Sequence, residues 1–179
     1  HNYIYSLLSE LFPINRSITG NGVRKTLEII KREIPDLNLK ELKTGTKCFD
    51  WEVPEEWNVE SAYILDPNKK KILDFRENNL HLVGYSQPKN LKIKKQDLEK
   101  HLHSIPDMPE AIPYVTSYYK KYWGFCLSHN QREQLPDGEY RVKIDSTFKK
   151  GVLNYAELII PGKLSKEIFF SSYICHPSM

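Results

Sequence analysis

One histidine near the end of the chain has the best surroundings for metal chemistry. His176 follows residues 168–175, an almost uninterrupted run of apolar, aromatic and small side chains that is too short for a free-standing helix. Such a run is typical of a strand buried on both faces. Pro177 cannot donate to a sheet ladder, so we expect the strand to end at His176, at the carboxyl edge where open α/β sheets bind ligands. A neutral imidazole there is a natural metal ligand, but a structural role stays open because a metal site needs three or more ligands.

The other histidines are weaker candidates. His101 and His103 would share one face of an extended segment, as in some metal sites, but they straddle an expected helix end, so hydrogen bonding is favoured. His81 alternates with leucines and is expected to face solvent or a polar groove. His129 follows Ser128, but a nucleophile and a base that are adjacent in sequence usually point apart, and no nucleophile elbow surrounds them. The sequence therefore argues against this dyad.

An aromatic block precedes the second half of the chain. Its members are Tyr118, Tyr119, Tyr122, Trp123 and Phe125. These rings could stack on sugars or bases. Aromatic side chains more often fill the core of a small β module that has few aliphatic residues, and this interpretation is favoured.

The charges argue against a polyanionic partner. The chain of 179 residues has 26 basic and 23 acidic residues and a net charge of +3, which is too balanced to imply nucleic acid or membrane binding. The lysine clusters at 69–71 and 92–95 are predicted to be solvated turns or faces. The carboxylate pairs at 50 and 52 and at 55–56 are predicted to be surface charges.

The cysteines indicate a reducing compartment. Cys48, Cys126 and Cys175 are widely spaced and form neither a disulfide framework nor a paired zinc motif, which favours a cytoplasmic setting. No apolar run approaches the ~20 residues of a transmembrane helix.

Two helices are predicted at the start of the chain. Helical spacing of apolar residues predicts one helix over residues 2–12 and a second that ends before Pro35. Thr19 or Asn21 can cap the second helix.

The loop between these helices carries Arg16 and two glycines. Its amide groups could hold an anion, but it lacks the lysine of a Walker motif and does not follow a strand. Arg16 and Ser17 are therefore predicted to tie the two helices together.

Short extended segments separated by turns predict an antiparallel β module from about residue 40 to 145. Strands are expected at 37–42, 48–53, 61–65, 71–75, 80–85 and 139–145, with a hairpin turn at 66–69. A short helix is expected over 95–101 and a proline-rich loop over 104–113.

A C-terminal hairpin is expected around Pro161 and Gly162, with residues 155–160 leading into the terminal strand. A central strand needs neighbours on both sides. The chain begins with His1 and ends three residues after His176, so we expect it to be a fragment of a longer protein.

Seven stretches together resemble the bacterial aminopeptidase-like proteins that are encoded among polysaccharide-biosynthesis genes. They are LFPINRSITG (11–20), GTKCFDWEVP (45–54), NLH (79–81), LHSIP (102–106), AIPYVTSYY (111–119), WGFCLS (123–128) and ICHPS (174–178). The resemblance runs across the whole chain and covers the front portion of such proteins.

The resemblance implies a mixed α+β and α/β fold. Residues 1–38 would be the N-terminal helix pair of a zinc-aminopeptidase-like α/β core. Residues 39–146 would be a small antiparallel β-rich domain inserted into that core, and residues 147–179 would start the core sheet with the C-terminal hairpin. A winged-helix tail would follow.

The resemblance also makes His176 the first zinc ligand, at the histidine position of a His-x-Asp motif. Ser178 stands in place of the aspartate, which orients the ligand imidazole in related enzymes. The bridging aspartate, the general-base glutamate and the other ligands would lie beyond Met179. No catalytic residue is therefore assigned, and the isolated chain is expected to be inactive.

The implied reaction is metal-assisted hydrolysis of an amide in a peptide or small molecule, with two zinc ions in the full-length protein. Residues 40–145 are expected to cover the pocket and set substrate choice. No nucleic acid or membrane partner is expected, and a homo-oligomer is compatible with the sequence. The alternative is a non-catalytic carbohydrate-binding, ligand-binding or interaction protein of a polysaccharide-biosynthesis pathway that uses the aromatic block.

Overall fold

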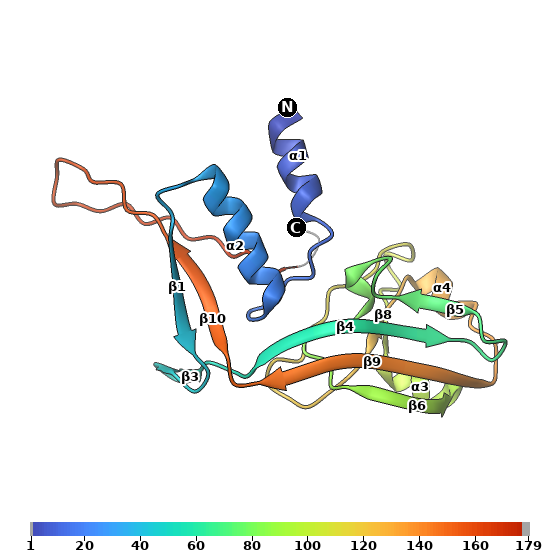
Figure 1. Cartoon of the computed structure of the whole chain (residues 1–179). Helices are drawn as coiled ribbons and strands as arrows, with labels where there is room; N and C mark the ends of the chain where they lie inside the picture. Colours follow the sequence, from blue (N-terminus) through green and yellow to red (C-terminus); the bar gives the residue numbers. More distant parts are fainter. Residues whose placement is uncertain (1, 177–179) are drawn as a thin grey trace. The chain divides into compact units, whose positions relative to one another are not determined.

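The computed structural model describes residues 2–176, which form two compact units (Figure 1). The first unit combines the residues up to Glu56 with those from Lys149 onward, and the second is Trp57–Phe148. The fold is mixed α/β with small antiparallel sheets.

Two helices start the first unit, and both predictions are confirmed. They are α1 (Asn2–Leu11) and α2 (Asn21–Glu33). The predicted side-chain cap of α2 is wrong, because Gly20 is the N-cap residue and no side chain makes a capping hydrogen bond there. Gly20 has φ 98°, a left-handed conformation that only glycine adopts readily, so the backbone makes the turn into the helix.

A two-stranded antiparallel ribbon continues the first unit. It pairs β1 (Asn38–Lys43) with β10 (Val152–Glu157). A minimal hairpin follows β1 and consists of β2 (Lys47–Cys48) and β3 (Trp51–Glu52). Because β1 pairs with β10, residues 38–43 belong to the first unit, whereas the sequence placed residues 39–146 in the inserted domain. The three-part domain division stays a prediction.

A four-stranded sheet organises the second unit, in the order β5-β4-β9-β6. Its strands are β4 (Glu56–Leu65), β5 (Lys71–Asp74), β6 (Lys89–Lys94) and β9 (Glu139–Lys149). The predicted hairpin at 66–69 joins β4 to β5, and Lys69 and Lys70 are exposed in its turn as expected. The sequence analysis missed β6, in which exposed Lys92 and Lys94 alternate with partly buried Leu91 and Ile93.

Short elements cover this sheet. They are η1 (Asn79–His81), α3 (Lys95–Leu98), η2 (Glu99–His101), β7 (Leu102–His103), β8 (Phe125–Cys126) and α4 (His129–Glu133). The helical turn at 95–101 and the irregular loop at 104–113 confirm the predictions. The predicted strand at 80–85 is wrong, because the Asn78 side chain accepts a hydrogen bond from the Leu80 amide and starts the 3-10 turn of η1.

The aromatic block contributes to the core of the second unit. Phe125 is fully buried and Trp123 is 8% exposed, whereas Tyr119 is 83% exposed. Tyr118 packs edge-on against Tyr85, whose ring also stacks on Trp57 at 5.6 Å. The core interpretation is therefore confirmed for Trp123 and Phe125 and is wrong for Tyr119.

The terminal segment departs most from the sequence-based expectation. After Glu157 the described residues contain no strand, so neither the hairpin nor the buried terminal strand is formed. Phe169 and Phe170 are 88% and 89% exposed. A buried strand needs ladder partners on both sides, and within residues 2–176 no strand pairs with this segment. Figure 1 shows the segment (red) leaving β10 and returning toward α2.

No described helix has both the length and the apolar character needed to cross a membrane.

Ile64→Ala should destabilise the second unit. Ile64 in β4 is completely buried, so its truncation removes apolar contacts and leaves a cavity. We expect a loss of about 2–5 kcal/mol in the free energy of unfolding, measured by urea denaturation with tryptophan fluorescence. Ile159→Ala is the matched control, because Ile159 is 83% exposed. Equal losses in the two variants would contradict this assignment of the core.

Candidate functional site

The main chain at His176 is held by a buried arginine. Arg16 is 4% exposed, and its Nε donates to the His176 carbonyl oxygen at 3.0 Å. Its Nη1 donates to the carbonyl oxygen of Leu11 at 2.6 Å. Arg16 was predicted to tie the two helices together. It does hold the end of α1, and its Nε also bonds to the terminal segment.

A pocket of about 100 Å³ lies beside this contact, and Arg16 and His176 both line it. Its other lining residues are Leu11, Thr26, Ile30, Tyr173 and Ile174. The buried hydroxyl of Thr26 has no hydrogen-bond partner among the described residues. Arg16, His176 and Thr26 therefore line one pocket with Tyr173 and three aliphatic residues.

No complete metal site is formed in the part of the chain that the structure describes. Within residues 2–176, no group of three or more His, Cys, Asp or Glu side chains could hold a metal ion. Ser178, the residue in place of the orienting aspartate, lies outside the described residues. The described residues therefore do not form a metal site by themselves, and the assignment of His176 as a zinc ligand stays a prediction.

Cys175 precedes His176 in the chain, and its pKa is affected by the same Arg16. Burial raises the pKa of the Cys175 thiol, although the nearby Arg16 acts in the opposite direction. Cys126 is a contrasting case, since almost complete burial raises the pKa of its thiol to about 12. All three cysteines are free, as the sequence predicts.

The remaining histidines of the second unit make hydrogen bonds. Nδ1 of His101 donates to the Trp123 carbonyl oxygen at 2.8 Å, and Nε2 of His103 contacts the Tyr122 hydroxyl at 2.9 Å, which confirms the prediction for this pair. Burial, with Arg132 nearby, lowers the pKa of His103.

His81 was predicted to face solvent or a polar groove, and this is wrong. Its ring is buried, and Nδ1 donates to the Cys126 carbonyl oxygen at 2.8 Å. The period-two argument failed here because residues 79–81 form a 3-10 turn and the expected strand is absent.

Ser128 and His129 do not form a dyad, as the sequence analysis argued. The Ser128 hydroxyl caps α4 by accepting from the Gln131 amide at 3.1 Å. Nδ1 of His129 instead lies 3.0 Å from Oγ of Ser104, a residue 25 positions earlier in the chain. Sequence reasoning missed this pair because no local pattern joins the loop after β7 to α4.

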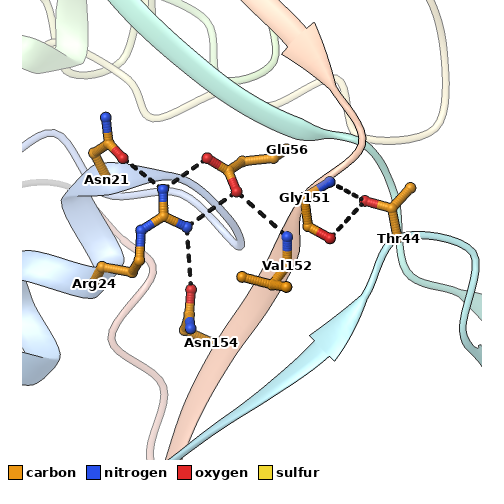
Figure 2. Close-up of polar contacts among 7 residues, drawn as sticks. All are labelled: Asn21, Arg24, Thr44, Glu56, Gly151, Val152 and Asn154. Carbon is orange, nitrogen blue, oxygen red and sulfur yellow. Dashed lines mark hydrogen bonds and ion pairs between the residues drawn. The ribbon is translucent and has the colours of Figure 1, made fainter.

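A buried carboxylate was also missed. Glu56 was predicted to be a surface charge, but its side chain is only 5% exposed. Arg24 binds both of its carboxylate oxygens, at 2.7 and 3.0 Å (Figure 2). The Val152 amide donates to the same carboxylate, and a Cβ at Gly151 would stand 2.3 Å from Glu56 Oε2. Glu56 is therefore enclosed by α2 and the start of β10, so its role is structural.

Arg24→Met should destabilise the first unit by about 3 kcal/mol, because it leaves the Glu56 carboxylate buried without its cation. Urea denaturation measures the loss. Arg32→Met is the matched control, because Arg32 pairs with Glu10 at the surface and its loss should change stability little. The double variant Arg24→Met and Glu56→Met should regain much of the stability, and a further loss would contradict this account.

Arg16→Met should release the terminal segment and expose Cys175. The thiol then loses its burial and its pKa falls toward the ordinary value, so alkylation by iodoacetamide at pH 8 should accelerate ~10-fold. Peptide mass spectrometry follows the rate at each cysteine. Cys126, which is 1% exposed, is the internal control and should stay unreactive. An unchanged rate at Cys175 would show that Arg16 does not hold the segment.

Known proteins match this chain over nearly its whole length. The chain is 51% identical over 176 residues to a Clostridium acetobutylicum protein described as "Putative polysaccharide biosynthesis protein with aminopeptidase-like domain", covering 98% of this chain and 40% of that protein. A crystal structure of a "putative peptidase" from Clostridium acetobutylicum matches with a TM-score of 0.93 at 50% identity, over 99% of this chain and 42% of that chain. The chain thus spans about two fifths of the length of these relatives.

These comparisons confirm the resemblance to aminopeptidase-like proteins of polysaccharide biosynthesis. Residues 56–147 match the family described as "Domain of unknown function (DUF2172)". This match covers slightly more than half of the chain, which therefore belongs to the DUF2172 family.

Proposed function

We propose that this chain is the front portion of a zinc-dependent aminopeptidase-like hydrolase and that His176 is one of its metal ligands. The observation that carries the proposal is the high identity, over nearly the whole chain, to a longer protein that is described as having an aminopeptidase-like domain. The position of His176 at a pocket, with its main chain held by the buried Arg16, supports the assignment.

The imidazole of His176 suits zinc, which takes nitrogen and sulfur ligands in three-ligand catalytic sites. The remaining ligands, those of a second ion, and the general base would come from the rest of the longer protein. When bound, zinc polarises the scissile carbonyl and lowers the pKa of a bound water toward ~7. Arg16 holds the main chain of His176 in place, beside a pocket that is lined mainly by apolar side chains.

The exposed terminal segment fits the same proposal. Ile168, Phe169 and Phe170 are each more than 80% exposed, an arrangement that costs hydrophobic free energy in isolation. In the longer protein this segment would form the buried central strand of the core sheet. The isolated chain would then lack both the sheet and most of the metal site, and would have no zinc-dependent activity.

The substrate class is proposed from the aminopeptidase-like relatives: a peptide or an amide-containing small molecule. The domain at residues 57–148 would set substrate choice. The near-balanced charge supports a small-molecule substrate over nucleic acid or a membrane, and three free cysteines support a cytoplasmic location.

The alternative, a non-catalytic glycan-binding protein that uses the aromatic block, has less support. Trp123 and Phe125 are buried in the core, and Tyr119 alone of the five offers a mostly exposed ring. A sugar platform needs accessible aromatic faces.

His176→Ala in the longer protein should abolish binding of one zinc ion, measured by elemental analysis of the purified protein. It should also lower amide hydrolysis of aminoacyl and N-acyl amino-sugar substrates at least ~100-fold, since a ligand of the metal is lost. Cys175→Ala, at the adjacent position, is the control and should keep its zinc. A wild-type protein without zinc, or a His176→Ala variant that retains all of it, would refute the proposal.

A further inference from the structure

Four polar side chains meet in the second unit, away from His176. Ser104 lies in the loop after β7, and His129, Arg132 and Glu133 belong to α4. Ser104 Oγ lies 3.0 Å from His129 Nδ1, and His129 Nε2 lies 3.7 Å from a carboxylate oxygen of Glu133. Arg132 Nη1 donates to Ser104 Oγ at 3.3 Å. Nothing in the proposed metal site uses these residues.

The donors and acceptors fix the direction of this chain of contacts. A guanidinium can only donate, so Ser104 Oγ accepts from Arg132 and keeps its own proton to give away. The acceptor within reach is Nδ1 of His129, and the ring proton of the neutral imidazole then sits on Nε2. Nε2 lies 3.7 Å from the exposed Glu133 carboxylate, longer than a hydrogen bond but close enough for the carboxylate to favour a proton on this nitrogen. Hydroxyl, base and carboxylate thus stand in the order of an activated nucleophile.

The group lies at the surface of the second unit and is anchored there. The His129 side chain is 28% exposed and Ser104 is half-buried. Arg132 is fixed by Glu99, whose carboxylate accepts from it at 2.7 Å and whose carbonyl oxygen accepts at 3.3 Å. Arg132, although paired with Glu99, thus keeps a cation beside the nucleophilic oxygen, where negative charge develops when a carbonyl is attacked.

We propose that Ser104 and His129 are a nucleophile and general base that hydrolyse carboxylic esters, with Glu133 orienting the ring and Arg132 stabilising the oxyanion. The Glu133 contact is long and the His129 ring is partly solvated, so we expect His129 to be a weak general acid and base. An ester is therefore a better substrate than an amide. An alkoxide leaves with less proton assistance than an amine. This activity is independent of the metal site.

Each step balances. Ser104 Oγ attacks the ester carbonyl carbon, its proton passes to His129 Nδ1, and the carbonyl oxygen becomes an oxyanion beside Arg132. The intermediate collapses, the ester C–O bond breaks, and the departing alcohol takes the proton from Nδ1 to leave an acyl group on Ser104. Water then attacks this acyl group, gives a proton to Nδ1, and releases the acid as that proton returns to Ser104 Oγ.

The test uses the 179-residue chain and a fluorophosphonate probe, which transfers its phosphonyl group to an activated serine with loss of fluoride. Intact-mass and peptide mass spectrometry should show one label, on Ser104. Ser104→Ala should abolish it, and Ser165→Ala, at an exposed serine in the terminal segment, should keep it. No label on Ser104 of the folded wild-type chain would overturn the proposal.

Kinetics separate catalysis from a merely structural contact. His129→Gln, with an unchanged circular dichroism spectrum, should slow labelling and p-nitrophenyl acetate hydrolysis at least ~100-fold. Glu133→Gln should lower kcat for p-nitrophenyl acetate ~10-fold with KM unchanged, since it orients the base and does not bind the ester. Equal labelling rates in wild type and His129→Gln would show that the Ser104 contact only ties the loop to α4, and would overturn the proposal.

Discussion

The first unit depends on one electrostatic constraint: a carboxylate that is removed from water must keep its cation. Glu56 is nearly inaccessible, and the Arg24 guanidinium meets both of its oxygens (Figure 2). This requirement brings a residue of α2 to the first residue of β4 and leaves room only for a glycine at position 151. Removing both charges costs less than removing one, so such a pair fixes where elements meet more than it adds net stability.

Most of the helices and longer strands could be predicted from the local sequence pattern. The two helices and the strand β9 were predictable because their apolar periodicity is repeated over several residues. The hairpin at 66–69 was predictable because turn residues separate two short extended runs. The strand β6 was not, because its lysine-rich sequence is typical of solvated turns as well as of edge strands. The pair β7 and β8 has two residues in each strand, and only tertiary contacts specify it.

The candidate sites also divide into residues that a local sequence pattern indicates and residues that only the fold brings together. His176 could be singled out from the sequence because an apolar run precedes it and a proline follows it. The burial of Glu56 could not be predicted, because its partner Arg24 lies 32 residues away on a different element. Ser104 and His129 are likewise joined only by the fold, since a proline-rich loop must return to α4 before their side chains can meet.

The lysines of β6 have a consequence for assembly. This strand is at one edge of the four-stranded sheet, and Lys92 and Lys94 are exposed along it. An incoming strand from another molecule would have to strip water from these ammonium groups before it could add to the ladder, which is how natural edge strands prevent fibril-like growth. Self-association of this protein should therefore proceed through side-chain surfaces and not by extension of the sheet at β6.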